Sequence, residues 1–127
     1  MNKLQNLTSD ARQNNIYDFN ERKIQVELYY SQVNVGWFIT LTDGDFKLQN
    51  ARLTCHYNYM NKWRRKLKWG LQIISKDGND PYNIEDFVSG RVELYFLTPD
   101  EVSYVTNFTF RYNSELLEKN AESLSFL

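Results

Sequence analysis

Apolar and polar residues alternate along most of the chain after residue 21, which is the pattern of half-buried β-strands. The first regular run covers Arg22–Tyr30, and after a turn at Ser31–Asn34 the alternation resumes over Val35–Thr42. These two runs predict a β-hairpin. Asp43-Gly44 then predicts a tight reversal into a third strand, because both residue types tolerate positive φ.

Further runs of the same period follow along the chain. A third strand begins at Asp45–Leu48, and the alternation in Ala51–Tyr57 predicts either a fourth strand or the third strand resumed after a kink at Gln49-Asn50. Leu67–Ile73 predicts another strand, and a last short one is expected in Asn107–Asn113. Six or seven short strands are therefore expected.

One stretch predicts a strand that runs directly into a helix. Val92–Phe96 alternates between an apolar and a polar face. Thr98 can cap the free amides of a helix, Pro99 suits the first helical position, and Glu101 stands three residues after the cap to complete a capping box. The stretch therefore predicts a strand followed by a short capped helix.

The spacing of these elements predicts a mainly β protein, built as a small antiparallel β-barrel or sandwich with one short capped helix and a weak C-terminal helix. We assign residues 1–20 to a flexible N-terminal arm, residues 21–113 to the β-domain and residues 114–127 to a C-terminal helical tail. The arm either stays flexible or orders against a neighbouring subunit. The expected contact residues of the arm and the tail are apolar: Leu4, Leu7, Ile16, Tyr17, Leu116 and Leu117.

Composition restricts the possible chemistry. The single cysteine, Cys55, excludes an internal disulfide and a multi-thiolate metal site. No apolar run is long enough to span a bilayer and residues 1–20 are polar, so we expect neither a transmembrane helix nor a signal peptide. His56 has no catalytic partner in the sequence, and no glycine-rich phosphate loop occurs. We therefore expect no enzyme, no metal and no cofactor.

Charge is distributed unevenly although the formal net charge is only −1. The basic loop, defined here as residues 62–68, interleaves cations with aromatic residues, which suits single-stranded nucleic acid because phosphates attract cations and bases stack on flat rings. The competing interpretation is a solvated loop that meets an acidic protein surface. The candidate contact residues of this loop are Lys62, Trp63, Arg64, Arg65, Lys66 and Lys68.

Acidic residues concentrate in a different part of the sequence. A basic region and an acidic region on one small domain suit head-to-tail or ring association between copies. The alternative is an ordinary scatter of surface charge. The acidic set comprises Asp77, Asp80, Glu85, Asp86, Asp100 and Glu101.

The order of these features resembles the small baseplate plug family of tailed bacteriophages. The resemblance covers about the middle two thirds of the chain, and its motifs are patterns of strand and turn rather than sets of chemical groups. The basic loop, the residues after Val102 and the N-terminal arm depart from it. The matching stretches are I-Q-V-E-L, G-W-F-I-T-L, L-Q-N-A-R-L, W-G-L-Q-I-I-S followed by D-G-N-D-P, and V-E-L-Y-F-L-T-P-D-E-V.

The resemblance implies a non-enzymatic structural protein of the virion, located in the tail or baseplate and made in the cytoplasm of the host bacterium. Its implied partners are further copies of itself, in a homo-oligomer or ring, and other tail or baseplate proteins, with no role for a membrane. The residues leave two alternatives open. One is a single-stranded nucleic-acid-binding β-barrel, and the other is a carbohydrate-binding module that uses exposed Trp and Tyr to stack on sugars.

Overall fold

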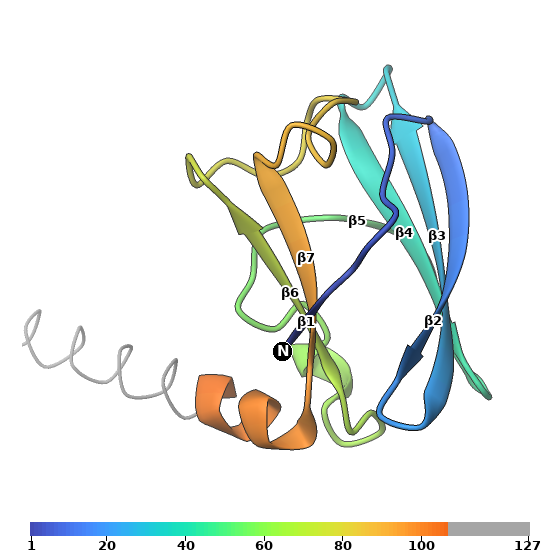
Figure 1. The fold of residues 1–127 in the computed structure, drawn as a ribbon, viewed down its shortest axis with the longest axis vertical. Coiled ribbons are helices and arrows are strands. Elements are labelled where there is room, and N and C mark those ends of the chain that lie inside the picture. Colours follow the sequence, from blue (N-terminus) through green and yellow to red (C-terminus); the bar gives the residue numbers. More distant parts are fainter. Residues whose placement is uncertain (107–127) are drawn as a thin grey trace, which may run out of the picture.

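Two antiparallel sheets face each other in the computed structural model, which describes residues 1–106 (Figure 1). The larger sheet has the strand order β2–β3–β4–β5, and the smaller one has the order β1–β7–β6. The sheets do not close into a barrel, so the sandwich alternative of the predicted mainly β fold is confirmed. The strands are β1 (Asn2–Lys3), β2 (Arg12–Phe19), β3 (Arg22–Ser31), β4 (Gly36–Asp43), β5 (Phe46–Arg52), β6 (Gly70–Ser75) and β7 (Val92–Leu97).

The predicted hairpin and the tight turn after it are both present. Strands β3 and β4 pair from Gln25 opposite Thr42 to Ser31 opposite Gly36. Strands β4 and β5 are joined by a two-residue turn in which Gly44 has a φ of +59°. Strand β5 is continuous through Asn50, which has a φ of +49° where the register with β4 shifts. The kink therefore lies within one strand, as in the second of the two interpretations.

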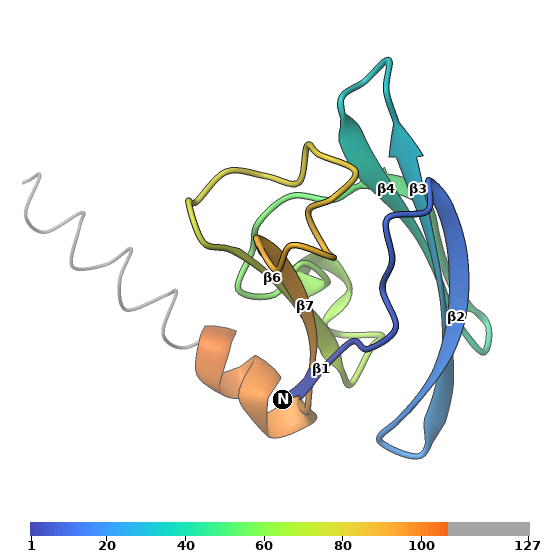
Figure 2. The same ribbon diagram turned by 45° about the horizontal axis from the view of Figure 1, so that its top comes forward.

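Residues 1–20, assigned from the sequence to an arm, instead contribute β1 and β2 to the two sheets. Strand β2 pairs with β3 at eight positions and forms an edge of the larger sheet. Its more buried positions include Gln13 and Asn15, so polar side chains hide the alternation that marks the other strands. Leu4 is buried and its N–H donates to the carbonyl of Leu94. The chain between β1 and β2 crosses from the smaller sheet to the larger one (Figure 2).

The core lies between the sheets and includes a polar link. Trp69 Nε1 donates a hydrogen bond to Asp43 Oδ2 at 2.7 Å, and Arg22 forms a salt bridge with the same carboxylate at 3.3 Å. Asp43 is only 7% exposed, so these contacts supply the partners that a buried carboxylate requires. The link joins the end of β4 to the segment before β6. The core includes Ile24, Val26, Trp37, Ile39, Leu41, Leu71, Ile73, Val92, Leu94 and Phe96.

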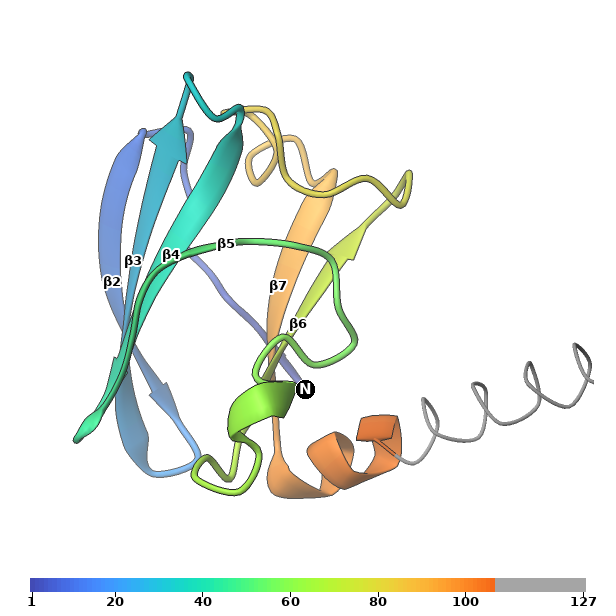
Figure 3. The same cartoon turned by 180° about the vertical axis from the view of Figure 1, so that it is seen from behind.

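The predicted capping box is present at the start of the helical residues 99–106. Thr98 N–H donates to Glu101 Oε1 at 3.0 Å, and Glu101 N–H donates to Thr98 Oγ1 at 3.3 Å. These residues lie at the same end of the sandwich as the 3₁₀ helix η1 (Asn61–Trp63), as Figure 3 shows. The strand expected in 107–113 and the helical tail expected in 114–127 fall outside the described residues. No helix within residues 1–106 is long and apolar enough to cross a membrane.

Candidate interaction surface

The basic loop is held by buried residues on both of its sides. Met60 precedes the loop and Leu67 lies within it, and both are buried, at 0% and 4% exposure. Asn58 Oδ1 accepts hydrogen bonds from the backbone N–H groups of Met60 and Leu71, at 3.0 and 3.2 Å. A Cβ atom on Gly70 would lie 2.6 Å from the same oxygen, so only glycine permits this close approach. The loop therefore projects its cations from a fixed base.

The five cations of the basic loop face solvent. Lys62, Arg64, Arg65, Lys66 and Lys68 are all exposed. None of them takes part in a salt bridge within residues 1–106, where six other salt bridges occur. Their contacts within the chain are weaker: Arg64 donates to the carbonyl of Asn61 at 3.1 Å, and the Lys62 ammonium lies 5.9 Å from the Trp63 ring centroid. The loop therefore presents uncompensated positive charge.

Trp63 differs from the free stacking platform that the sequence suggested. Its indole is half-buried and meets Phe46 edge to face, with ring centroids 5.9 Å apart. Tyr57, which the alternation placed with the apolar set, is 57% exposed. The reason is that Leu53 N–H donates to the Trp37 carbonyl and the chain then leaves the sheet, so the alternation ends before Tyr57.

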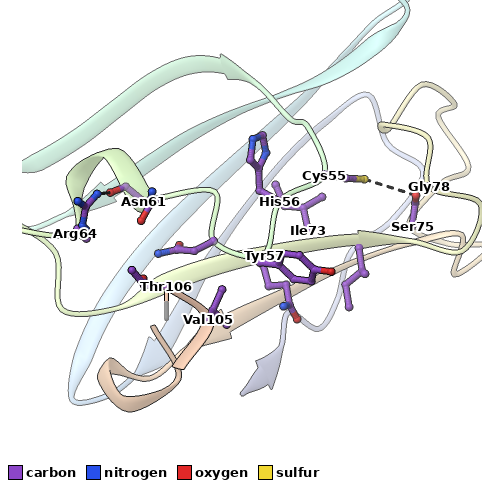
Figure 4. Close-up of a pocket in the computed structure, with 13 residues that line it drawn as sticks. Cys55, His56, Tyr57, Asn61, Arg64, Ile73, Ser75, Gly78, Val105 and Thr106 are labelled. Atoms are coloured by element: carbon purple, nitrogen blue, oxygen red, sulfur yellow. Dashed lines mark hydrogen bonds between the residues drawn. The ribbon is translucent and has the colours of Figure 1, made fainter. Parts of the chain in front are cut away.

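A groove adjoins the basic loop along β6 and has a volume of about 560 Å³ (Figure 4). Asn61 comes from η1, Arg64 from the basic loop, Ile73 and Ser75 from β6, and residues 105–106 from the end of the described helix. Ile74 and Tyr57 add exposed apolar surface. The groove thus combines an apolar lining with a cation at one end.

The backbone edge of β6 that faces the groove is already paired. His56 and Ile73 exchange two backbone hydrogen bonds, at 3.0 and 3.2 Å, and Tyr59 N–H donates to the Leu71 carbonyl at 2.7 Å. An incoming strand therefore cannot extend the sheet at these positions. The groove can bind a partner through side chains.

The reactive side chains beside the groove are not arranged as a nucleophile and a base. His56 Nδ1 lies 3.0 Å from Thr54 Oγ1, whereas Cys55 Sγ lies 3.6 Å from Ser75 Oγ. Figure 4 shows the imidazole and the thiol pointing in different directions. Within residues 1–106, no group of three His, Cys, Asp or Glu side chains could hold a metal ion.

The acidic set contains a buried ion pair that the sequence did not reveal. Asp86 is 2% exposed and accepts hydrogen bonds of 2.7 Å from Arg91 Nε and Nη2. Its Oδ2 also accepts the backbone N–H groups of Tyr82 and Asn83 at 2.8 Å. Burial raises the pKa of Asp86, but the hydrogen bonds from Arg91 and the backbone outweigh it and hold the pKa below its ordinary value.

Arg91 also engages other parts of this loop. Its Nη1 lies 2.7 Å from Asp77 Oδ1, and its guanidinium lies 4.3 Å from the Tyr82 ring centroid. The Arg91 side chain is only 16% exposed, although arginine is usually found at the surface. Only the local excess of carboxylates in the sequence hinted at a buried cation.

Further acidic residues also have partners within the chain. Asp80 Oδ1 accepts the Cys55 N–H at 2.8 Å, and Glu101 pairs with the N-terminal amine of Met1 at 2.7 Å as well as capping the helix. Glu85 and Asp100 form no salt bridge within residues 1–106. The basic loop therefore remains a candidate for head-to-tail association, whereas most of the acidic set is already engaged within the chain.

The apolar residues expected to contact a neighbouring subunit differ in burial and in the contacts that they make. Leu4 belongs to the core, and Leu7 is half-buried against it. Tyr17 packs on Phe96 at a centroid distance of 5.6 Å and donates through its hydroxyl to the Gln5 carbonyl, so both it and Leu4 anchor the N-terminal segment to its own sandwich. Ile16 is 66% exposed on β2 and remains available. Leu116 and Leu117 lie outside the described residues.

A second hollow lies on the outer face of the larger sheet and bears on the carbohydrate alternative. Tyr29 and Phe38 line it, but an arginine covers each ring. Arg12 lies 4.7 Å from the Tyr29 centroid, and Arg52 lies 5.7 Å from that of Phe38. Neither ring offers an open face on that side for a sugar to stack on.

Comparisons with known proteins add no relative. No protein-family model matches the chain, and a search of curated proteins found no match. Function is therefore inferred from the geometry of the basic loop and groove, together with the resemblance in the sequence.

Proposed function

We propose that this protein is a structural component of a bacteriophage tail or baseplate that assembles through protein–protein contacts near the hub or tube. One observation carries the proposal: the five cations of the basic loop are exposed and have no carboxylate partner within residues 1–106, whereas most members of the acidic set are engaged within the chain. The protein is made in the host bacterial cytoplasm and incorporated into the virion. It has no enzymatic activity and binds no cofactor in this proposal.

The partner surface is acidic in this account. Exposed cations keep most of their hydration, so placing them near carboxylates on another protein increases the association rate and fixes orientation at little desolvation cost. The groove beside the loop supplies the apolar contact that charge alone lacks. The basic loop and the groove together form the contact surface.

Co-purification tests this proposal. The tagged full-length chain is co-expressed with the products of the neighbouring genes, and a tail or baseplate protein is expected to co-purify with it. The triple variant Arg65→Glu, Lys66→Glu, Lys68→Glu should lose the partner, whereas Arg12→Glu, a charge reversal on β2, should retain it. Neighbouring genes unrelated to a phage tail, together with no co-purified partner, would overturn the proposal.

The second candidate is a single-stranded nucleic-acid-binding module. It is favoured by the exposed cations of the basic loop, because a positively charged surface attracts the phosphates of single-stranded nucleic acid. It predicts binding of a labelled oligonucleotide that weakens steeply as salt increases. Absence of binding at low salt, with wild-type protein of native circular dichroism, would eliminate this candidate.

A further inference from the structure

The groove along β6 is open over part of its apolar lining. Ile74 is 41% exposed, and Arg64, which belongs to the basic loop, lines one end of the groove. Asn58 also lines the groove, and its buried Nδ2 has no hydrogen-bond partner within the described residues. An occupant that matches this lining carries apolar side chains, carboxylates and an exposed oxygen acceptor.

The chain itself contains a segment of that chemistry. Residues 114–127 read S-E-L-L-E-K-N-A-E-S-L-S-F-L. The segment has three glutamates against one lysine, so its side chains carry a net charge of −2 (1 − 3), and five of its residues are Leu or Phe. Its charge is thus opposite to that of the basic loop, and its apolar residues match the groove lining.

We propose that the groove and basic loop of one copy bind residues 114–127 of a second copy. This inference rests on the proposed assembly function and names the partner of the same surface. The carboxylates of Glu115 and Glu118 face the loop cations, and Leu116 and Leu117 contact the apolar lining near Ile74. The complementary charge and the apolar match together select this occupant.

The length of the connection allows the acidic segment to reach a second copy. Thr106 lines the groove, and eight residues, 107–114, separate it from Glu115. Eight extended residues span up to roughly 27 Å, whereas the six residues of β6 span roughly 20 Å. The connection is therefore long enough to carry the acidic segment beyond its own groove.

Such a contact joins two different surfaces of the same chain. A surface that binds a different surface on the next copy is heterologous, so repetition gives a ring if the rotation closes and a filament if it does not. This matches the ring expected from the sequence, with the acidic side supplied by residues 114–127 instead of by Asp77 and Asp86.

A mixing experiment with two full-length variants tests the inference. The groove variant carries Ile74→Asp with Arg64→Glu, and the segment variant carries Leu116→Asp with Leu117→Asp. Light scattering coupled to size-exclusion chromatography should show oligomers for the wild type and the 15.2 kDa monomer for each variant alone. The equimolar mixture should form a complex of two chains, because it contains one intact groove and one intact segment.

The control variant carries Val33→Asp with Arg12→Glu. Val33 is 93% exposed in the β3–β4 loop and Arg12 lies on β2, both outside the groove lining, so this variant should oligomerise as the wild type does. A monomeric wild type, oligomers that survive in either test variant, or a mixture that stays monomeric would each overturn the inference. Co-purification with a tail protein is a separate readout, so the proposed function can stand if this inference fails.

Discussion

Two charged loops of this protein use their charges in opposite ways. In the loop between β6 and β7, Arg91 is bound by Asp86 and Asp77, and Asp86 is 2% exposed. In the basic loop, five cations are exposed and none has a carboxylate partner within the described part of the chain. The first loop uses charge to hold the fold, and the second leaves charge available for a partner.

Burial explains the difference. A carboxylate removed from water requires a partner and several hydrogen bonds, and Asp86 has both. An exposed lysine or arginine is stabilised by water, so leaving it unpaired costs the fold little. Charges that are exposed and unpaired are therefore the better candidates for intermolecular contact in this protein.

The largest expected effect comes from breaking the buried ion pair. Asp86→Ala should lower the free energy of unfolding by about 3 kcal/mol, because it removes the carboxylate that accepts from Arg91 Nε and from two backbone N–H groups. Urea denaturation followed by tryptophan fluorescence measures this loss. Glu85→Ala is the matched control, since Glu85 is exposed, and it should change the free energy by less than about 0.5 kcal/mol. Equal effects of the two substitutions would refute the structural role of Asp86.

Much of the larger sheet could be predicted because its strands alternate strictly. Ile24, Val26 and Leu28 point to one face, and the Asp43-Gly44 turn fixes where the next strand begins. Strand β2 was missed because Gln13 and Asn15 occupy its more buried positions. A strand is recognised in a sequence by apolar residues at every second position. An edge strand whose inward-facing residues are polar therefore gives no such signal.

The candidate surface was predictable in part. The cations of the basic loop are evident in the sequence, and the structure adds that they are unpaired within residues 1–106. The groove was not predictable, since it joins η1, β6 and residues 105–106, which are far apart in the sequence. The burial of Arg91 was not predictable either, because an alternating pattern cannot show that a neighbouring loop folds over a polar position.

Acid should weaken the first loop. The pKa of Asp86 is held below its ordinary value of 3.8 in the folded protein, so its stabilising contribution is complete above that value and is lost as the pH falls through the folded pKa. The free energy of unfolding should therefore fall as the pH drops below about 3.8. The drop should be smaller in Asp86→Asn, which has no carboxylate to protonate. Parallel pH profiles for the two proteins would contradict this assignment.

The capping box should have a moderate effect. Thr98→Ala removes the acceptor of the Glu101 N–H and should lower the free energy of unfolding by about 1 kcal/mol. Chemical denaturation measures the loss. Ser103→Ala, at an exposed position within the same helix, should change the free energy by less than about 0.5 kcal/mol. A loss no greater than that of the control would show that the cap contributes nothing.

The smallest effect on stability is expected in the basic loop. The triple variant Arg65→Glu, Lys66→Glu, Lys68→Glu should change the free energy of unfolding by no more than about 0.5 kcal/mol, because these side chains are solvated and unpaired. Thermal and urea denaturation test this directly. A loss comparable to that of Asp86→Ala would mean that the loop holds the fold and is not free to bind.

Lysine footprinting compares the basic loop in the isolated chain and in the tail assembly that we propose, and it tests the central claim most directly. In the isolated chain, Lys62, Lys66 and Lys68 should react readily with an amine-reactive label, as should Lys23 on the opposite sheet, whose side chain is 79% exposed. In purified phage tails, labelling of the three loop lysines should fall severalfold relative to Lys23. Equal labelling in the isolated chain and in the tail would contradict the assignment of the basic loop as the contact surface.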